Sequence, residues 1–172
     1  VNSFAQNLGI RMYYNGTSKL YNTNERKTVQ QMSAIFDRYA SALPDDGTFV
    51  MTVVPTSSRV TQFMAQKKPE RMTSDTESFV YAVTGDKVET VSACDVLSER
   101  TVAGEYMFFT TDMHWTPEGA YYVVREMLSK CGKEPAAYTD FNIAKEYPFL
   151  GTLYRDNPTK QMKNNPDTLD II

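Results

Sequence analysis

Apolar residues recur at steps of three and four between positions 25 and 43, which is the spacing of one face of an α-helix. Asn22 and Glu25 have the three-residue spacing of a capping box, and the turn-forming run from Pro44 to Gly47 follows. These features predict an amphipathic helix over residues 25–43. Its inward stripe comprises Val29, Met32, Phe36, Tyr39 and Leu43.

Three short segments are almost continuously apolar and rich in β-branched or aromatic residues, which is typical of buried strands. They are "TFVMTVVP" at 48–55, "KVETVSA" at 87–93 and "EYMFFTT" at 105–111. The final "TLDII" has the same character and indicates the start of another strand. Weaker patterns predict a hairpin at 11–21 and short helices at 59–68, 70–82 and 95–100.

The most clearly marked helix follows Trp115. Thr116 is a favourable N-cap, Pro117 suits the first helical position, and Glu118 complements the positive helix start. Gly132 provides a stop after the last turn. The inward stripe of this helix comprises Ala120, Val123, Val124, Met127 and Cys131.

Helices that alternate with buried strands predict an α/β fold with a largely parallel sheet. The length of 172 residues fits a single domain over residues 1–172. Because a strand begins at the last residues, we expect this range to be the N-terminal part of a longer domain. The chain begins with Val1 rather than Met, so we interpret it as a trimmed or mature form that has lost an export signal.

The composition argues against several classes of function. The net charge is -3 and no face is rich in Lys and Arg, which argues against nucleic acid as a partner. A mean hydropathy of -0.45, with no long apolar run, argues against a transmembrane segment. Cys94 and Cys131 lack metal-binding spacing, and a disulfide and two buried thiols are equally consistent with them. With a single histidine, a metal site would need mostly carboxylates, so no metal is expected.

The single histidine and the single tryptophan stand side by side in "TDMHWT". They lie between the third predicted strand and the following helix, and ligands of α/β folds bind at the carboxyl ends of strands. There Asp112 can accept a hydrogen bond from Nδ1 of His114, fix its tautomer and stabilise the imidazolium. The competing interpretation is structural, with His114 as a surface residue near a helix start and Trp115 as a core residue.

The segment "FFTTDMHWTPEGAYYVVREM" resembles the signature of the DHHW protein family, in which an aromatic strand leads into Asp-x-His-Trp-Thr and then a Gly-Ala-aromatic helix. That family is similar to the alginate O-acetylation proteins and to SGNH hydrolases. The segments "FVMTVVPTSS" and "YPFLGTLYRD" match further parts of the family pattern in the same order. Met113 stands where the family name implies a histidine, a position that varies in the related acetylation proteins.

The resemblance implies a three-layer, flavodoxin-like SGNH fold with a Ser-His-Asp triad, in which Asp112 and His114 are the acid and the base. The family's serine lies downstream of Asp-x-His, yet Ser129 falls about three turns into the helix, too far from His114. We therefore expect the nucleophile beyond residue 172. Ser57 and Ser58, at the end of the first strand, are outside candidates, although a capping role explains them better.

These features predict an exported SGNH-like serine esterase or O-acyltransferase that transfers or removes acetyl groups on an extracellular polysaccharide, without a metal or organic cofactor. Trp115, Tyr154 and Arg155 are candidate sugar contacts, and Gly151 allows the backbone to approach the cleft closely. The alternatives are a non-catalytic polysaccharide-binding module, an inactive relative of the family, and a folding unit whose open sheet edge forms a homo-oligomer.

Overall fold

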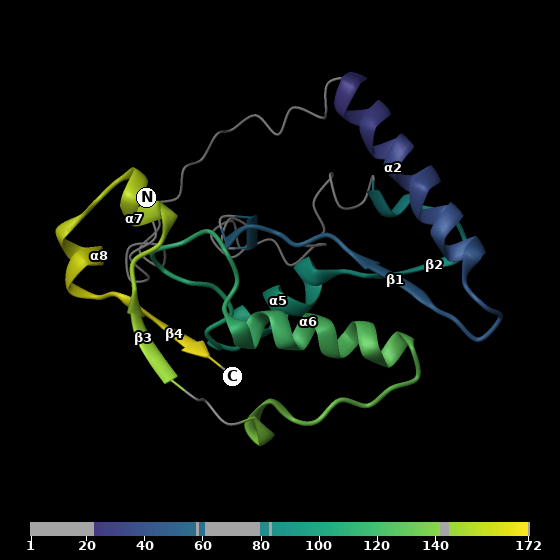
Figure 1. Ribbon diagram of the computed structural model, residues 1–172. Coiled ribbons are helices and arrows are strands. Elements are labelled where there is room, and N and C mark those ends of the chain that lie inside the picture. The colour runs from purple at the N-terminus through teal and green to yellow at the C-terminus, as the bar shows by residue number, and fades with distance from the viewer. Residues whose placement is uncertain (1–22, 58, 61–79, 83, 142–144, 172) are drawn as a thin grey trace.

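The computed structural model describes residues 23–57, 59–60, 80–82, 84–141 and 145–171 (Figure 1). The predicted hairpin at 11–21 lies outside the described residues. The helices predicted at 59–68 and 70–82 lie mostly outside them as well, and the parts that are described, residues 59–60 and 80–82, are helical. The elements in chain order are α2 Thr23–Ala42, β1 Phe49–Thr52, β2 Val88–Val91, α5 Ala93–Val102, α6 Pro117–Lys130, a short 3-10 helix Tyr138–Asp140, β3 Lys145–Phe149, α7 Thr152–Asp156, α8 Lys160–Asn164 and β4 Asp167–Ile171.

The two central strands, β1 and β2, pair in parallel, as the sequence predicted. Their register places Thr52 opposite Val91. Just beyond the strand ends, the Tyr81 hydroxyl accepts a hydrogen bond from the Val53 amide at 3.1 Å and donates to the Val91 carbonyl at 2.6 Å. This hydroxyl therefore continues the hydrogen-bonding ladder and fixes the carboxyl ends of both strands relative to each other.

Helices cover both sides of this pair of strands. Figure 1 shows α2 on one side of β1 and β2, and α5 and α6 on the other. The arrangement agrees with the predicted three-layer α/β fold. The buried core lies on the side of α5 and α6 and consists of Val60, Ala93, Cys94, Leu97, Met107, Phe108 and Val123.

The helix α2 has close to the predicted extent but covers only part of the predicted stripe. Ser33 is buried, and the Phe36 ring packs on the Phe49 ring of β1 with 5.9 Å between centroids. Met32, Tyr39 and Leu43, predicted to face inward, are 47 %, 63 % and 39 % exposed. The prediction for these three residues is wrong because the helix contacts the sheet along one narrow line.

The helix α6 begins as predicted. The hydroxyl of its N-cap, Thr116, accepts a hydrogen bond from the Gly119 amide at 3.1 Å, and Gly132 adopts a φ of +67° after the last turn. Val123 is fully buried, in agreement with the predicted stripe, whereas Val124 is 47 % exposed. The stripe is therefore narrower than its apolar residues indicate.

The strand predicted at 105–111 is not a strand. Among the described residues it forms one isolated bridge, between Phe108 and Trp115. The apolar run is buried because its side chains enter the core, not because its backbone joins a sheet. The amides of Thr110 and Thr111 instead donate to the carboxylate of Asp167, at 2.8 and 2.7 Å. A side chain thus satisfies the donors that a neighbouring strand would have used.

The C-terminal part forms a second sheet, in which β3 and β4 pair antiparallel. The predicted final strand is therefore present as β4, but its described partner is β3 rather than the parallel pair. The helices α7 and α8 connect β3 to β4, and Figure 1 shows this unit beside the carboxyl ends of β1 and β2. It lies where an α/β fold places its functional site.

Two further observations complete the fold. Cys94 is buried in the core and Cys131 ends α6, and no disulfide joins them. None of the helices in the described part of the chain has the length and apolar character that a membrane span requires.

Candidate functional site

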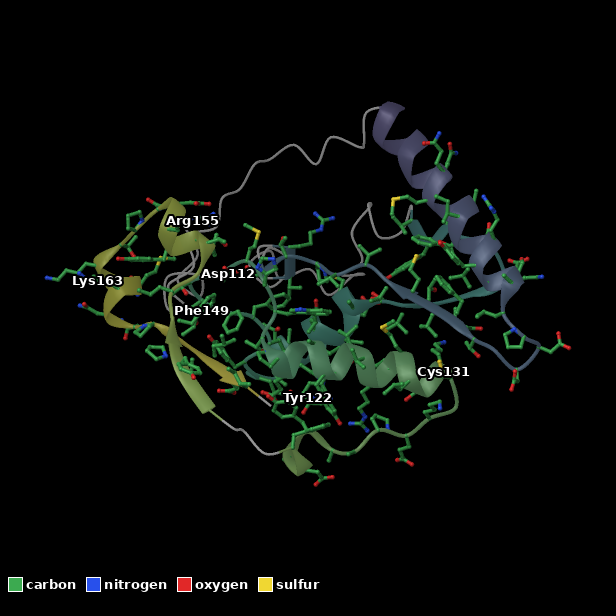
Figure 2. The ribbon with its side chains drawn as sticks, viewed as in Figure 1. Asp112, Tyr122, Cys131, Phe149, Arg155 and Lys163 are labelled. Atoms are coloured by element: carbon green, nitrogen blue, oxygen red, sulfur yellow. The ribbon has the colours of Figure 1, made fainter. Side chains whose placement is uncertain are left out.

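The Asp112–His114 segment forms a tight turn held at the end of the parallel strands. Its base is closed by hydrogen bonds from the Phe109 amide to the His114 carbonyl, at 3.2 Å, and from Thr116 to Met107, at 2.9 Å. The amide of Ser57, just beyond β1, donates to the Met113 carbonyl at 2.9 Å. Figure 2 shows Asp112 on the side of the molecule toward which β1 runs. The turn therefore occupies the predicted place.

Asp112 and His114 are bonded to each other. The Oδ1 atom of Asp112 accepts hydrogen bonds from the His114 amide, at 2.9 Å, and from Nδ1 of its ring. The carboxylate side chain is 5 % exposed and the imidazole 68 % exposed. Since an ionised carboxylate only accepts, Nδ1 carries the proton, which leaves Nε2 on the exposed ring as a proton acceptor.

The second carboxylate oxygen of Asp112 is bonded to Thr152. Its Oδ2 atom accepts from the Thr152 amide at 2.7 Å and from the Thr152 hydroxyl at 2.9 Å. Burial acts to raise the pKa of Asp112, but the hydrogen bonds from Thr152 and His114 outweigh it and lower the pKa to about 2. Asp112 is therefore an anion at any physiological pH.

Gly151 allows the approach of Thr152 to Asp112. A Cβ atom at this glycine would lie 2.3 Å from the Cβ of Asp112 and 2.4 Å from its Oδ2. The Gly151 amide donates to the Thr111 hydroxyl at 3.0 Å. The absence of a side chain is thus needed for space at this position, because the backbone of Gly151 lies directly against the side chain of Asp112.

A second buried carboxylate, Asp167, supports the turn from β4. Its Oδ1 accepts from the Tyr106 hydroxyl and from the amide and hydroxyl of Thr110, and its Oδ2 accepts from the amide and hydroxyl of Thr111. Burial opposes ionisation, but these donors lower the pKa of Asp167 below its usual value. The same burial, and the neighbouring Asp167, raise the pKa of the Tyr106 hydroxyl.

The candidate serines differ in their relation to this turn. Ser57 is beside it through its amide, but the residue is only 2 % exposed. Ser58 lies outside the described residues. Ser129 is in the last part of α6, where its hydroxyl donates to the Arg125 carbonyl at 3.1 Å, so it is remote from His114 as predicted. Among the residues that the structure describes, neither Ser57 nor Ser129 therefore presents an exposed hydroxyl to the His114 ring.

The candidate sugar contacts have mixed surroundings. Trp115 is half-buried and packs against the core cluster. Tyr154 is half-buried, and its amide donates to the Thr111 carbonyl at 3.1 Å, which brings α7 to the turn. Arg155 has a side chain 72 % exposed and pairs with Asp156 at 3.1 Å, and Figure 2 shows it on the outer part of the C-terminal unit.

The sequence did not indicate three residues that hold the Asp112–His114 turn, namely Thr111, Thr152 and Asp167, whereas the close approach at Gly151 was predicted. Thr152 bonds Asp112, Gly151 makes space for that bond, and Thr111 and Asp167 anchor the turn. The only signal was the Gly-Thr pair in "FLGTLY", which the family pattern shares but whose role no local spacing defines.

One protein family matches the sequence over most of its length. Its description is an SGNH hydrolase-like domain of the acetyltransferase AlgX, and the match covers residues 12–167. No curated protein matches the sequence.

Two solved structures are similar in fold. A DHHW family protein from Eubacterium siraeum has a TM-score of 0.58 at 21 % identity, with 83 % of this chain and 46 % of that chain covered. The O-acetyltransferase domain of Pseudomonas putida AlgJ has a TM-score of 0.56 at 20 % identity, with 88 % of this chain and 58 % of that chain covered. The likeness establishes the fold, and the chain spans about half the length of these relatives.

Proposed function

The chain belongs to the SGNH hydrolase-like family of AlgX acetyltransferase domains, and we propose that it supplies the acid and the base of an enzyme that transfers acetyl groups to, or removes them from, a polysaccharide. The observation that carries this proposal is the bond between the buried Asp112 carboxylate and Nδ1 of the exposed His114 ring. We further propose that residues 1–172 belong to one domain, which the family match over 12–167 supports.

The chemistry follows from the tautomer of His114. As a serine oxygen attacks the acetyl carbonyl carbon, Nε2 of His114 takes the hydroxyl proton, and Asp112 stabilises the imidazolium that forms. When the tetrahedral intermediate collapses, the same proton passes to the departing alcohol oxygen and the acetyl group stays on serine. A sugar hydroxyl or water then accepts the acetyl group through the reverse sequence of proton transfers.

The nucleophile in this proposal is the serine that the family pattern places downstream of Asp-x-His, with Ser57 as the alternative among the described residues. The proposed sugar contacts are Tyr154 and Arg155, because α7 carries them directly after the residue that bonds Asp112. Trp115 is a weaker candidate, since it packs against the core. The proposed location is outside the cytoplasm, where polysaccharides are accessible, and the chemistry requires no cofactor.

The proposal is tested with the natural protein and p-nitrophenyl acetate. We expect the wild type to release acetate, His114→Ala to abolish the release, and Glu126→Ala, on the exposed side of α6, to leave it unchanged. Unchanged activity of His114→Ala would contradict the assignment. Polysaccharide binding that survives the loss of both His114 and Asp112, in a protein without acetyl chemistry, would instead identify a binding module.

A further inference from the structure

We propose that Thr152 is a positioning residue for the acid–base pair: it occupies Oδ2 of Asp112 so that Oδ1 alone serves the His114 ring. The effect of Thr152 on catalysis rests on the proposed function. Its effect on the orientation of the imidazole can be tested without any enzyme activity.

The two oxygens of an ionised carboxylate offer about four acceptor positions. At Asp112 two of them, on Oδ2, are used by the amide and hydroxyl of Thr152, at 2.7 and 2.9 Å. The other two, on Oδ1, are used by the amide and ring of His114. The carboxylate thus has one orientation that satisfies all four donors, and in it Oδ1 faces Nδ1.

The position of Thr152 is itself fixed from the other side of the turn. The Gly151 amide donates to the Thr111 hydroxyl at 3.0 Å, and the Tyr154 amide donates to the Thr111 carbonyl at 3.1 Å. Thr111 precedes Asp112 in the chain. The start of α7 and the turn therefore form one hydrogen-bonded unit, which holds the backbone of Thr152 beside Asp112.

A purely structural interpretation makes a different prediction. Thr152 begins α7, and a hydroxyl near a helix start contributes to stability in many proteins. If that were its only role, removing the hydroxyl would lower stability and leave the His114 ring as it is. If the Thr152 hydroxyl orients Asp112, its loss leaves the Thr152 amide as the single donor to Oδ2, so the carboxylate can rotate and the second imidazole tautomer is admitted.

The experiment uses ¹⁵N NMR of the imidazole, which is unambiguous because His114 is the only histidine. Spectra are recorded at about pH 8.5, above the usual titration range of imidazole. We expect the wild type to show the Nδ1–H tautomer. Thr152→Val, which keeps the shape but not the hydroxyl, should show a mixture of both tautomers, and Thr152→Ser should restore the wild-type spectrum. Thr152→Ala serves if the valine variant does not fold.

A matched control separates orientation from stability. Thr159 is the N-cap of α8, and its hydroxyl accepts a hydrogen bond from the Met162 amide at 3.1 Å, a bond that serves this helix and not Asp112. Thr159→Val should lower the thermal midpoint as much as Thr152→Val and leave the tautomer unchanged. A Thr152→Val protein that keeps the pure Nδ1–H tautomer would overturn the inference.

Activity gives a second and separate readout. In a wild type that hydrolyses p-nitrophenyl acetate, Thr152→Val should reduce kcat about tenfold with KM within about twofold, since partners of this kind act on orientation. Thr152→Ser should recover the rate. A wild type without activity contradicts the proposed function, whereas the tautomer measurement still decides the role of Thr152.

Discussion

The hydroxyl of Thr111 donates to the carboxylate of Asp167 at 2.5 Å, although the two residues are 56 positions apart in the sequence. Thr111 also donates its amide to the same oxygen, at 2.7 Å. Because Thr111 precedes Asp112, this contact fixes the backbone from which the candidate acid projects. The carboxyl-terminal strand β4 thereby determines the geometry of a turn that comes long before it in the chain.

Replacing Asp112 by Asn tests the role of the carboxylate. With its oxygen held by the Thr152 donors, the Asn amide would point its NH₂ group at the imidazole, which must then accept through Nδ1 and carry its proton on Nε2. We expect kcat for p-nitrophenyl acetate to fall roughly 10³-fold or more, because this tautomer cannot act as the base. Retention of the wild-type rate in a folded Asp112→Asn protein would exclude the proposed acid.

Replacing Gly151 by Ala tests the close approach of α7 to the turn. The new Cβ would lie 2.3 Å from Asp112 Cβ, so Gly151 and the Asp112 side chain must move apart, at a cost of roughly 2–3 kcal/mol in the free energy of unfolding, together with loss of activity. Gly104→Ala is the matched control. It has a φ of +90° and no atom within 4 Å of the added Cβ, so it should cost about 1 kcal/mol and spare activity. Urea unfolding and acetate release measure both effects, and equal behaviour of the two variants would contradict the steric argument.

Replacing Asp167 by Asn tests the second carboxylate. The Asn side chain would turn an NH₂ donor toward threonine and tyrosine groups that are themselves donors to Asp167, leaving some of them unsatisfied. We expect a loss of roughly 3 kcal/mol in the free energy of unfolding, since buried donors lose a charged acceptor. The control, Asp170→Asn on the same strand, should stay within about 0.5 kcal/mol of wild type. If Asp167→Asn lowers the free energy of unfolding no more than Asp170→Asn does, other contacts hold the turn.

The acid stability of the protein should depend on Asp112. Its folded pKa of about 2 lies below the ordinary value of 3.8, so the unfolded chain binds a proton more readily than the folded one. The resulting stabilisation is therefore complete above pH 3.8 and is lost as the pH falls toward 2, an effect of roughly 2 kcal/mol. Urea midpoints measured from pH 5 to pH 2 should fall less steeply for Asp112→Asn than for wild type. Parallel curves for the two proteins would show that Asp112 does not titrate in this window.

The sequence predicted well those features that depend on neighbouring residues. The start of α6 follows from Thr116 and Pro117, and the parallel pairing of β1 and β2 follows from two β-branched apolar runs in an alternating pattern. The spacing of Asp112 and His114 also allows their contact to be predicted, since two residues in one turn lie close in any compact fold. The family pattern, matched over residues 12–167, then supplies the fold.

The same reasoning gave a wrong strand at 105–111, because burial and strand pairing produce the same apolar pattern. Only the folded chain shows that the amides of Thr110 and Thr111 bond a carboxylate side chain instead of a neighbouring strand. In α2, likewise, an apolar stripe does not reveal how much of it the sheet covers, and Met32 and Tyr39 remain exposed.

The sequence by itself therefore determined the local elements and the pair Asp112–His114, since hydrogen-bonding partners two residues apart are set by the turn that contains them. The tertiary structure decided which groups hold that pair. Thr152 lies 40 residues from Asp112, and Asp167 lies 56 residues from Thr111. A buried carboxylate accepts from any donor that the fold brings within about 3 Å, and nothing in the local spacing of residues specifies which donor that is.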